Sequence, residues 1–300
     1  MNANNEALGI SDALAELVSR TERSVVRVDG RRAPASGFIW SNGVVVTADH
    51  NLERDEISVG LPDGKAARAV VAGRDPATDL AALRVDTGES PALEWADAAV
   101  LRAGQLLLGV TRPGRAPRAS LGCLSRVSDS WRAPSGGKLD RYLEAELPLH
   151  PGLSGGLAVD LRGRVAGMLC AGLARGLPLV VPHLTLERVV AQLLGQGRVR
   201  RGFLGVSTLP VRLGGTLERA AGQAGALLVS AVEPRSPAER AGLLLGDALL
   251  SLDGERLSSV GDLLPLLDED RIGRSFPLAV VRGGEVRKLE IEVGARGGPR

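Results

Sequence analysis

The chain has 300 residues, of which 44% are hydrophobic and 24% charged, as is typical of a globular protein with about two domains. Its 37 basic and 35 acidic residues nearly balance, and no basic block alternates with aromatic residues, so no nucleic-acid-binding function is indicated. No run of about 18 apolar residues predicts a membrane span, and the N-terminus lacks the basic start and apolar stretch of a signal peptide. We therefore expect a cytoplasmic protein, or one of the cell envelope if a leader was removed.

The cysteines and histidines form no recognisable metal-binding pattern, so no cofactor is predicted. Cys123 and Cys170 are the only cysteines, and we expect two reduced, buried thiols rather than a disulfide. The three histidines, His50, His150 and His183, are widely spread and match no metal-ligand spacing.

Residues 1–22 predict an N-terminal helical segment, with an amphipathic helix over residues 7–20. Short apolar strands follow, some joined by hairpin turns such as Asn42-Gly43. Strands at this spacing predict sheets closed into two barrels, over about residues 23–110 and 111–182. The strands are expected at residues 24–30, 37–48, 57–64, 66–73, 80–86, 104–112, 119–127, 142–149, 156–172 and 178–182.

Two further segments complete the first domain, which we expect to end at residue 197. Residues 128–139 are rich in Gly, Ser and Pro and predict a loop. Residues 184–197 predict a helix, with Thr185 as its N-cap and Gly195 or Gly197 near its end.

The arginine-rich residues 198–201 predict a linker to a second domain over residues 202–295, followed by a tail at 296–300. This second domain combines strands with two short helices, of which the first is opened by Ser236 with Pro237 at its first position. The other signals are a helix starting near Ser259 or Val260 and hairpin turns at Asp253-Gly254 and Gly283-Gly284.

Three motifs supply residues for nucleophilic catalysis in the chain order His, Asp, Ser. TADH ends at His50, DPATDLAAL contains Asp79, and PGLSGG contains Ser154. A serine hydroxyl needs a base that takes its proton, which an imidazole does near neutral pH while a carboxylate orients and stabilises it. The glycines around Ser154 permit a sharp turn, so we expect the amides of Gly152 and Ser154 to point together at a developing oxyanion.

Each motif alone is also typical of a structural feature, namely a tight turn, a core or surface histidine and a turn-capping aspartate. Their order, and their positions at the ends of apolar strands, favour one catalytic site over three unrelated features. The order also differs from the Ser, Asp, His order of the α/β-hydrolases, and no strand–elbow–helix pattern surrounds Ser154. A hydrolase acting on small esters is therefore disfavoured.

At these motifs the chain resembles the HtrA (Deg) family of trypsin-like serine proteases, over about residues 24–293. SGFIWSNGVVVTADHNL, GRDPATDLAALRV and HPGLSGGLAVDLRGRVAGM resemble the family's stretches around its catalytic His, Asp and Ser. RRGFLGV and VEPRSPAERAGLLLGDALLSLDGERL resemble its C-terminal PDZ domain. The resemblance implies a mainly β protein with a trypsin-like double β-barrel followed by a PDZ domain. It also implies His50 as the base, Asp79 as the orienting residue, Ser154 as the nucleophile and Gly152 as an oxyanion donor.

Some positions depart from the family's pattern. Leu153 stands where Asn usually precedes the serine, and Asp49 stands where a neutral residue usually precedes the histidine. We expect Leu153 to change how the oxyanion loop orders. We expect Asp49 to face solvent, with a carboxylate that points inward as the alternative. His150 replaces a common Asn, and Glu146 a common Asp. Residues 1–24 lack the aromatic side chains that build many family trimers, so a homo-oligomer stays open and no trimer is predicted.

The strand after the nucleophile, at residues 165–171, is expected to pair with an extended substrate. Met168, Leu169, Cys170 and Ala171 are expected to line the wall of the specificity pocket, with barrel core as the alternative for Met168 and Leu169. No acidic residue marks the floor of this pocket, so small or medium aliphatic side chains are predicted before the scissile bond.

In the second domain, Phe203, Leu204, Gly205 and Val206 resemble the carboxylate-binding loop of a PDZ domain. Their backbone amides are expected to receive a peptide C-terminus, with the peptide adding as a strand. The alternative is that these residues form only a first strand. The loop at 128–139 is a candidate relay between the two domains.

Two functional hypotheses follow. The first is a serine endopeptidase of HtrA type that degrades unfolded or damaged proteins through an acyl-enzyme, while its PDZ domain binds C-terminal peptides. The second is a catalytically weak or inactive chaperone or PDZ binding protein that keeps the protease fold. Leu153 and Asp49 are the only support for the second hypothesis, and covalent labelling of Ser154 separates the two.

Overall fold

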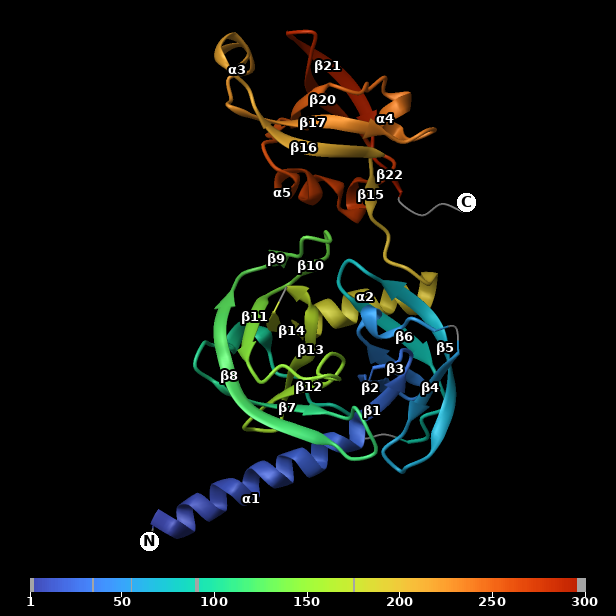
Figure 1. The fold of residues 1–300 in the computed structure, drawn as a ribbon, viewed down its shortest axis with the longest axis vertical. Helices are drawn as coiled ribbons and strands as arrows, with labels where there is room; N and C mark the ends of the chain where they lie inside the picture. The colour runs from blue at the N-terminus through green and yellow to red at the C-terminus, as the bar shows by residue number, and fades with distance from the viewer. Residues whose placement is uncertain (1–2, 34, 55, 90–91, 175, 296–300) are drawn as a thin grey trace. The chain divides into compact units, whose positions relative to one another are not determined.

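The computed structural model describes residues 3–33, 35–54, 56–89, 92–174 and 176–295, with side chains of the first helix from Leu8 onward. The chain divides into two compact units, Met1–Val199 and Arg200–Arg300. Figure 1 shows two groups of curved strands in the first unit and a sheet with short helices in the second.

Six antiparallel strands close the first barrel in the order β1-β2-β3-β6-β5-β4. The predicted Asn42-Gly43 turn joins β2 to β3, with Gly43 at a φ of 79°. Alternate Val, Ile, Leu and Ala side chains of these strands fill the barrel interior, as the apolar pattern predicts. The strands are β1 (Val25–Asp29), β2 (Ser36–Ser41), β3 (Val44–Thr47), β4 (Ile57–Gly60), β5 (Ala66–Asp75) and β6 (Leu80–Arg84).

The second barrel also has six antiparallel strands, in the order β11-β14-β13-β12-β7-β8. The structure places β7 in this barrel because β7 pairs with β8 and β12, whereas the strand spacing assigns residues up to 110 to the first barrel. The barrel strands are β7 (Leu106–Thr111), β8 (Arg118–Ser128), β11 (Tyr142–Glu146), β12 (Leu157–Asp160), β13 (Val165–Ala174) and β14 (Leu177–Pro182).

The segment expected as a loop at 128–139 contains a short hairpin of β9 (Trp131–Arg132) and β10 (Lys138–Leu139). The Gly, Ser and Pro residues that suggest a loop form the turn between these strands. Short 3-10 helices in the first unit are η1 (Glu22–Ser24), η2 (Asp49–Asn51) and η3 (Ala98–Val100), and those in the second unit are η4 (Leu264–Leu267) and η5 (Glu269–Arg271).

The first helix, α1 (Ala3–Thr21), contacts β7 and buries Leu17, whereas Leu8 and Ile10 are exposed. The second helix, α2 (His183–Gln196), contacts β5 and β6 of the first barrel and β13 and β14 of the second. Its buried face joins one hydrophobic core with residues of both barrels, so α2 covers their junction.

The ends of α2 differ partly from expectation. The N-cap is Pro182, which offers no side-chain cap, so the prediction of Thr185 as N-cap is wrong. Thr185 is buried, and its hydroxyl donates to the carboxylate of Asp140 because it faces the second barrel rather than the helix end. The C-terminus is capped by Gly197 with a φ of 73°, which is one of the two glycines expected near the helix end.

An aromatic cluster lies where the two barrels meet. Phe38 and Trp40 of β2 contact Trp95, which belongs to the connection between the barrels. The rings of Trp95 and His183 are stacked, with centroids 4.4 Å apart and an interplanar angle of 15°. Burial lowers the pKa of His183, which favours the neutral ring in this stack.

The second unit contains a six-stranded antiparallel sheet in the order β16-β17-β18-β20-β21, with β16 at one edge and β19 paired with β18. The predicted caps are present, since Ser236 caps α4 with Pro237 following it, and Ser259 and Asp262 form a capping box at α5. The strands are β16 (Val206–Arg212), β17 (Gly225–Val232), β18 (Ala248–Leu252), β19 (Glu255–Arg256), β20 (Ser275–Arg282) and β21 (Glu285–Glu292), and the helices are α3 (Gly215–Ala221), α4 (Pro237–Arg240) and α5 (Val260–Leu263).

Two further elements close the second unit. β15 (Gly202–Phe203) pairs with β22 (Gly294–Ala295), and the tail expected at 296–300 lies outside the described residues.

Both cysteines are free thiols, as expected, but Cys123 is half-buried and only Cys170 is fully buried. No helix among the described residues combines the length and apolarity that crossing a bilayer requires.

Candidate active site

His50 and Asp79 come from two turns at the end of the first barrel and face each other. Nδ1 of His50 lies 2.6 Å from Oδ2 of Asp79, and the backbone N–H of His50 donates to Oδ1 at 3.0 Å. Asp79 has a φ of 53°, a conformation that Asp tolerates better than most residues with a side chain. Asp75 fixes this turn by accepting hydrogen bonds from the backbone N–H and hydroxyl of Thr78. The sequence DPATD therefore builds a turn that directs Asp79 toward His50.

Asp79 is held in its ionised form. Burial acts to raise its pKa, but the hydrogen bond and electrostatic interaction with His50, together with the Cys170 thiol, lower it below its usual value. Sγ of Cys170 donates to Oδ2 of Asp79 at 3.0 Å. Burial and the Asp79 charge raise the thiol pKa of Cys170 well above its usual value, so the thiol keeps its proton. An ionised carboxylate can orient an imidazole and stabilise its cation.

Ser154 is buried at 5% exposure in a turn of the second barrel. Its hydroxyl oxygen accepts a hydrogen bond from the backbone N–H of Ala171 at 3.1 Å. Within the described part of the chain, no hydrogen bond joins this hydroxyl to His50. The neighbouring residue Gly172 lies against the His–Asp pair, because a Cβ there would overlap Oδ2 of Asp79 and lie 2.8 Å from Nδ1 of His50. Adjacent residues of β13 thus contact all three predicted triad residues.

Gly172 and Cys170 are site residues that the motifs do not reveal as such. Gly172 has a sequence signal, since an isolated glycine in a strand pattern often marks a close backbone approach. Cys170 has no comparable signal, because a lone cysteine in an apolar strand is typical of ordinary core.

The turn before Ser154 has a defined geometry. The N–H of Leu153 donates to the carbonyl of His150 at 3.1 Å, and Gly152 has a φ of 87°, as in a type II turn with Pro151 at its first central position. Among the described residues, the amides of Gly152 and Ser154 donate no hydrogen bond, which leaves both available to an oxyanion. Leu153, at 1% exposure, packs in the core of the second barrel. Its side chain therefore anchors the turn.

Asp49 is buried at 7% exposure, so the expectation that it faces solvent is wrong. Its Oδ1 accepts a hydrogen bond from Nε of Arg74 at 2.6 Å, and its carbonyl accepts one from Nη2 at 3.2 Å. β5 brings Arg74 to the turn that carries His50, and the resulting ion pair compensates the buried charge of Asp49. Glu146 is exposed, and Nδ1 of His150 lies 3.0 Å from the carbonyl of Pro151.

The residues expected at the specificity pocket divide into two groups. Met168, Leu169 and Cys170 are each 0% exposed and pack in the hydrophobic cores, so they present no surface to a ligand in this structure. Met168 and Leu169 therefore fit the alternative expectation that they belong to the barrel core, because both faces of β13 are covered. Ala171 is half-buried, and Gly172 is exposed. Residues 171–173 have no ladder partner among the described strands, but the N–H of Ala171 is bonded to the Ser154 hydroxyl and Leu173 is buried.

In the second unit, the loop between β15 and β16 has bound carbonyls and free amides. The carbonyl of Leu204 accepts from Ala238 N–H, and that of Gly205 accepts from Glu233 N–H, each at 2.8 Å. In the described part of the chain, the amides of Leu204 and Gly205 donate no hydrogen bond. Gly205 has a φ of 82°, and β16 follows as the edge strand of its sheet. Phe203 lies in β15, and Val206 begins β16.

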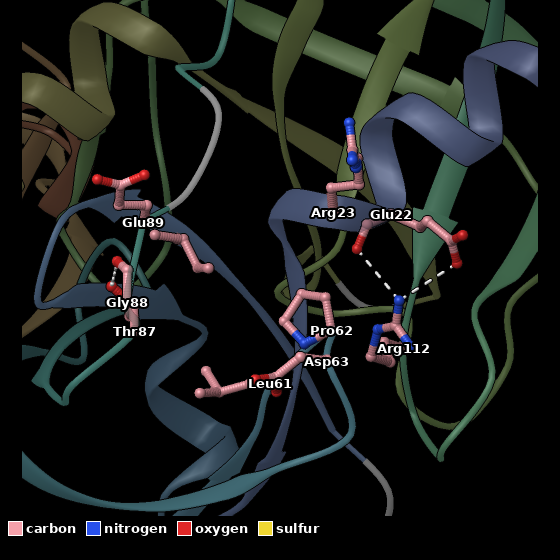
Figure 2. A pocket seen from close by; sticks show the side chains of 10 residues that line it. Glu22, Arg23, Leu61, Pro62, Asp63, Thr87, Gly88, Glu89 and Arg112 are labelled. Carbon is pink, nitrogen blue, oxygen red and sulfur yellow. Dashed lines mark hydrogen bonds and ion pairs between the residues drawn. The ribbon is translucent and has the colours of Figure 1, made fainter.

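A cavity of about 770 Å³ elsewhere in the first unit contains none of the predicted triad residues. Figure 2 shows acidic and basic side chains around it, with the Arg112 guanidinium bonded to the carbonyl and the carboxylate of Glu22. In the described part of the chain, no group of three or more His, Cys, Asp or Glu side chains is arranged to hold a metal ion.

Two closed six-stranded barrels with the His–Asp pair on one and the serine turn on the other define the class of trypsin-like peptidases. In the comparisons, the family described as trypsin-like peptidase domain matches residues 35–168, and the PDZ domain family matches residues 202–293. The structure is similar to that of an HtrA-type protease, AlgW with decapeptide, at a TM-score of 0.73 and 26% identity, covering 95% of this chain and 99% of that one.

Sequence relatives agree with this class. The chain is 32% identical to a probable periplasmic serine endoprotease DegP-like of Halomonas elongata, over 88% of this chain and 57% of the relative. It is also 32% identical to one with the same description from Pseudomonas fluorescens, over 87% of this chain and 56% of the relative. The chain thus spans a little over half the length of these relatives. The chain therefore contains a trypsin-like peptidase domain followed by one PDZ domain, and the proteins to which it is similar are described as DegP-like and HtrA-type proteases.

Proposed function

We propose that the chain is a serine endopeptidase that cleaves unfolded or damaged proteins through an acyl-enzyme. One observation carries this proposal: consecutive residues of β13 contact the three predicted triad residues, Cys170 meeting Asp79, Ala171 meeting Ser154, and Gly172 lying against His50 and Asp79. This arrangement supports the proposed roles of Ser154 as nucleophile, His50 as base and Asp79 as orienting carboxylate.

In the proposed reaction, the Ser154 hydroxyl leaves the Ala171 amide and donates its proton to Nε2 of His50 as its oxygen attacks the substrate carbonyl. Asp79 holds Nδ1 and stabilises the imidazolium. The free amides of Gly152 and Ser154 bind the oxyanion, where one donor typically contributes about 3 kcal/mol of barrier lowering. His50 then gives its proton to the leaving amine, and water attacks the acyl-enzyme by the same route.

The substrate would bind as an extended strand along residues 171–173, which lack a ladder partner. Because the predicted pocket side chains Met168 and Leu169 are buried, we propose that backbone and the small Ala171 side chain shape this subsite, and that small or medium aliphatic residues precede the cleaved bond. A peptide library tests this preference, and a strong preference for Arg or Lys would contradict it.

We propose that the second unit binds peptide C-termini through the amides of Leu204 and Gly205, with the peptide pairing along β16. The similar HtrA-type protease is described with a decapeptide. A peptide with a free apolar C-terminal residue should bind the full chain, and its amidated form should bind at least tenfold more weakly. Equal affinities would reject the role of these amides.

A second candidate function is a binding protein with weak or no proteolysis. It is favoured by the hydrogen bond from Ala171 N–H to the Ser154 hydroxyl, because this bond holds the nucleophile away from its base. Binding of substrate, or of a peptide to the PDZ domain, would have to release it. The 128–139 segment is a candidate relay for such a signal, since Ser135 donates to the carbonyl of Ala77, in the turn that positions Asp79, at 2.7 Å.

Casein cleavage and fluorophosphonate labelling of the natural chain beside Ser154→Ala test the proposal, with and without a PDZ-binding peptide. Cleavage and labelling that are lost only in Ser154→Ala would establish the endopeptidase. A folded natural chain that neither cleaves nor labels under either condition would favour the binding protein. Activity unchanged by saturating peptide would exclude the relay.

A further inference from the structure

Ser36 connects the first barrel to the turn that contains Gly152. This serine begins β2 and is 0% exposed. Its hydroxyl donates to the carbonyl of Gly152 at 2.7 Å and accepts from the backbone N–H of Arg112 at 3.0 Å. The hydroxyl therefore joins two segments of the chain that lie far from it in sequence.

Asn51 makes the second connection. It directly follows His50, is 0% exposed, and its side-chain amide donates to the carbonyl of Ser154 at 3.1 Å and to Oγ1 of Thr47 at 3.0 Å. The Thr47 hydroxyl in turn donates to the backbone carbonyl of Ser36 at 2.6 Å. Three buried polar side chains of the first barrel thus form one network, which we call the inter-barrel clamp: Ser36, Thr47 and Asn51.

The inter-barrel clamp completes the hydrogen bonding of two peptide groups in the turn that contains Ser154, the one between Gly152 and Leu153 and the one between Ser154 and Gly155. In the peptide between Gly152 and Leu153, the carbonyl binds Ser36, and the Leu153 N–H binds the carbonyl of His150. In the peptide after Ser154, the carbonyl binds Asn51, and the Gly155 N–H binds the carbonyl of Leu169 at 2.9 Å. Both peptides are bound at both ends, so neither can rotate without losing two hydrogen bonds.

The peptides that remain are those whose N–H groups belong to Gly152 and Ser154. These two amides donate to no described group, while the carbonyls of Gly152 and Ser154 are both bound. Gly155 lies close to the first barrel, and this leaves little room for rearrangement of the turn. A Cβ on Gly155 would overlap the carbonyl of Ser36 and lie 3.0 Å from Oγ1 of Thr47.

Arg112 holds the clamp from its other side. Its guanidinium is bonded to the carbonyl of Val25 at 2.8 Å and to the carbonyl and carboxylate of Glu22 at 3.2 Å, as Figure 2 shows for Glu22. Arg112 is only 5% exposed, so the backbone N–H that it offers to Ser36 is fixed in place. The hydroxyl of Ser36 is therefore oriented with its hydrogen toward Gly152.

We propose that Ser36 and Asn51 are positioning residues that hold the amides of Gly152 and Ser154 in the geometry that receives the oxyanion. This inference rests on the proposed peptidase function. Loss of either side chain frees a buried carbonyl of the turn, and the turn then relaxes to satisfy that carbonyl in another way. This relaxation raises the free energy of the transition state, because binding of the substrate in its ground state does not depend on the two free amides.

The test compares the full-length variants Ser36→Ala and Asn51→Leu with the natural chain. We measure kcat and KM for a peptide substrate, and the affinity for a peptide boronic acid, whose tetrahedral adduct needs the same amides. Active sites are counted by titration with fluorophosphonate to the endpoint, and kcat is expressed per active site. We expect kcat to fall about 10- to 100-fold with KM changed less than about threefold, and the boronate to bind more weakly by a similar factor. Ser36→Thr retains the hydroxyl and should restore most of kcat.

Ser120→Ala is the matched control, since it removes a buried hydroxyl that has no hydrogen-bond partner among the described residues. Thermal unfolding of all variants separates loss of folding from loss of positioning, and the two clamp variants provide independent tests. The inference would be overturned if Ser36→Ala and Asn51→Leu kept the kcat of the natural chain per titrated site, or lost no more kcat than Ser120→Ala. Either result would leave the proposed peptidase function standing. A natural chain without peptidase activity would overturn the proposed function and the inference with it.

Discussion

The thiol of Cys170 donates to Oδ2 of Asp79 at 3.0 Å, and the same oxygen lies 2.6 Å from Nδ1 of His50. Cys170→Ala removes this donor, so we expect kcat/KM to fall about 2- to 10-fold, as the loss of one modest hydrogen bond implies. Cys170→Ser keeps a donor and should retain activity. Peptide hydrolysis is the measurement, with Cys123→Ala as the control for removing a thiol from the other position. A fully active Cys170→Ala would show that the thiol is only packing.

Gly172→Ala should abolish most activity while the chain stays folded. The added Cβ would overlap Oδ2 of Asp79 and crowd Nδ1 of His50, so the pair must separate. We expect kcat/KM to fall at least 100-fold, because a base without its orienting carboxylate loses the correct tautomer. Gly195→Ala, where a Cβ meets nothing within 4 Å, is the control and should leave hydrolysis unchanged. Near-natural activity of Gly172→Ala would contradict the observed packing.

Arg74→Ala should destabilise the first unit. Without Arg74, the buried carboxylate of Asp49 loses the partner of its ion pair. We expect the free energy of unfolding to fall by about 1–3 kcal/mol, and a second substitution, Asp49→Asn, to recover part of this loss. Arg68→Ala removes an exposed arginine of the same strand and serves as control in thermal unfolding. An Arg74→Ala variant as stable as the natural chain would refute this role of the ion pair.

The buried ion pair of Asp247 and Arg282 should make the second unit sensitive to acid. Burial acts to raise the pKa of Asp247, but hydrogen bonds from Arg282 and from the N–H of Leu244 lower it below its usual value. The carboxylate therefore stabilises the fold fully above the unfolded value of about 3.9, and this contribution is lost as pH falls through the lower folded value.

Calorimetry of the full chain measures this effect. Asp247→Asn should destabilise the second unit by about 2–3 kcal/mol at neutral pH, and the difference from the natural chain should shrink as pH falls below about 4. Glu285→Gln, which disrupts an exposed ion pair with Arg287, should change stability by less than about 1 kcal/mol. A constant difference at all pH values would exclude the ionised carboxylate as its source.

Local patterns predict most of the fold. Alternating apolar residues mark the strands of both barrels, and Asn42-Gly43 and Ser236-Pro237 mark a turn and a helix start that the structure contains. Patterns fail where one residue type fits two roles. Thr185 has the chemistry of an N-cap, yet its hydroxyl binds Asp140, because tertiary contacts decide between the two. The short helix α3 has only seven residues and lies between Gly214 and Gly222, so it gives no clear helical period.

The sequence predicts only those site residues that belong to recognisable motifs. The structure brings Asp79 to His50 and places Ser154 beside β13, but Arg74, Ser36 and the burial of Asp49 depend on how strands far apart in sequence meet. The placement of Met168 and Leu169 could not be decided from sequence, because a strand with both faces covered shows no alternation.

The aromatic cluster gives the molecule a built-in optical signal. Tryptophan occurs three times in the chain, and all three positions, Trp40, Trp95 and Trp131, belong to the first unit. Two of them lie in the cluster at the junction of the barrels. Intrinsic tryptophan fluorescence therefore follows the melting of the first unit and the parting of its two barrels, while the second unit unfolds without contributing to that emission.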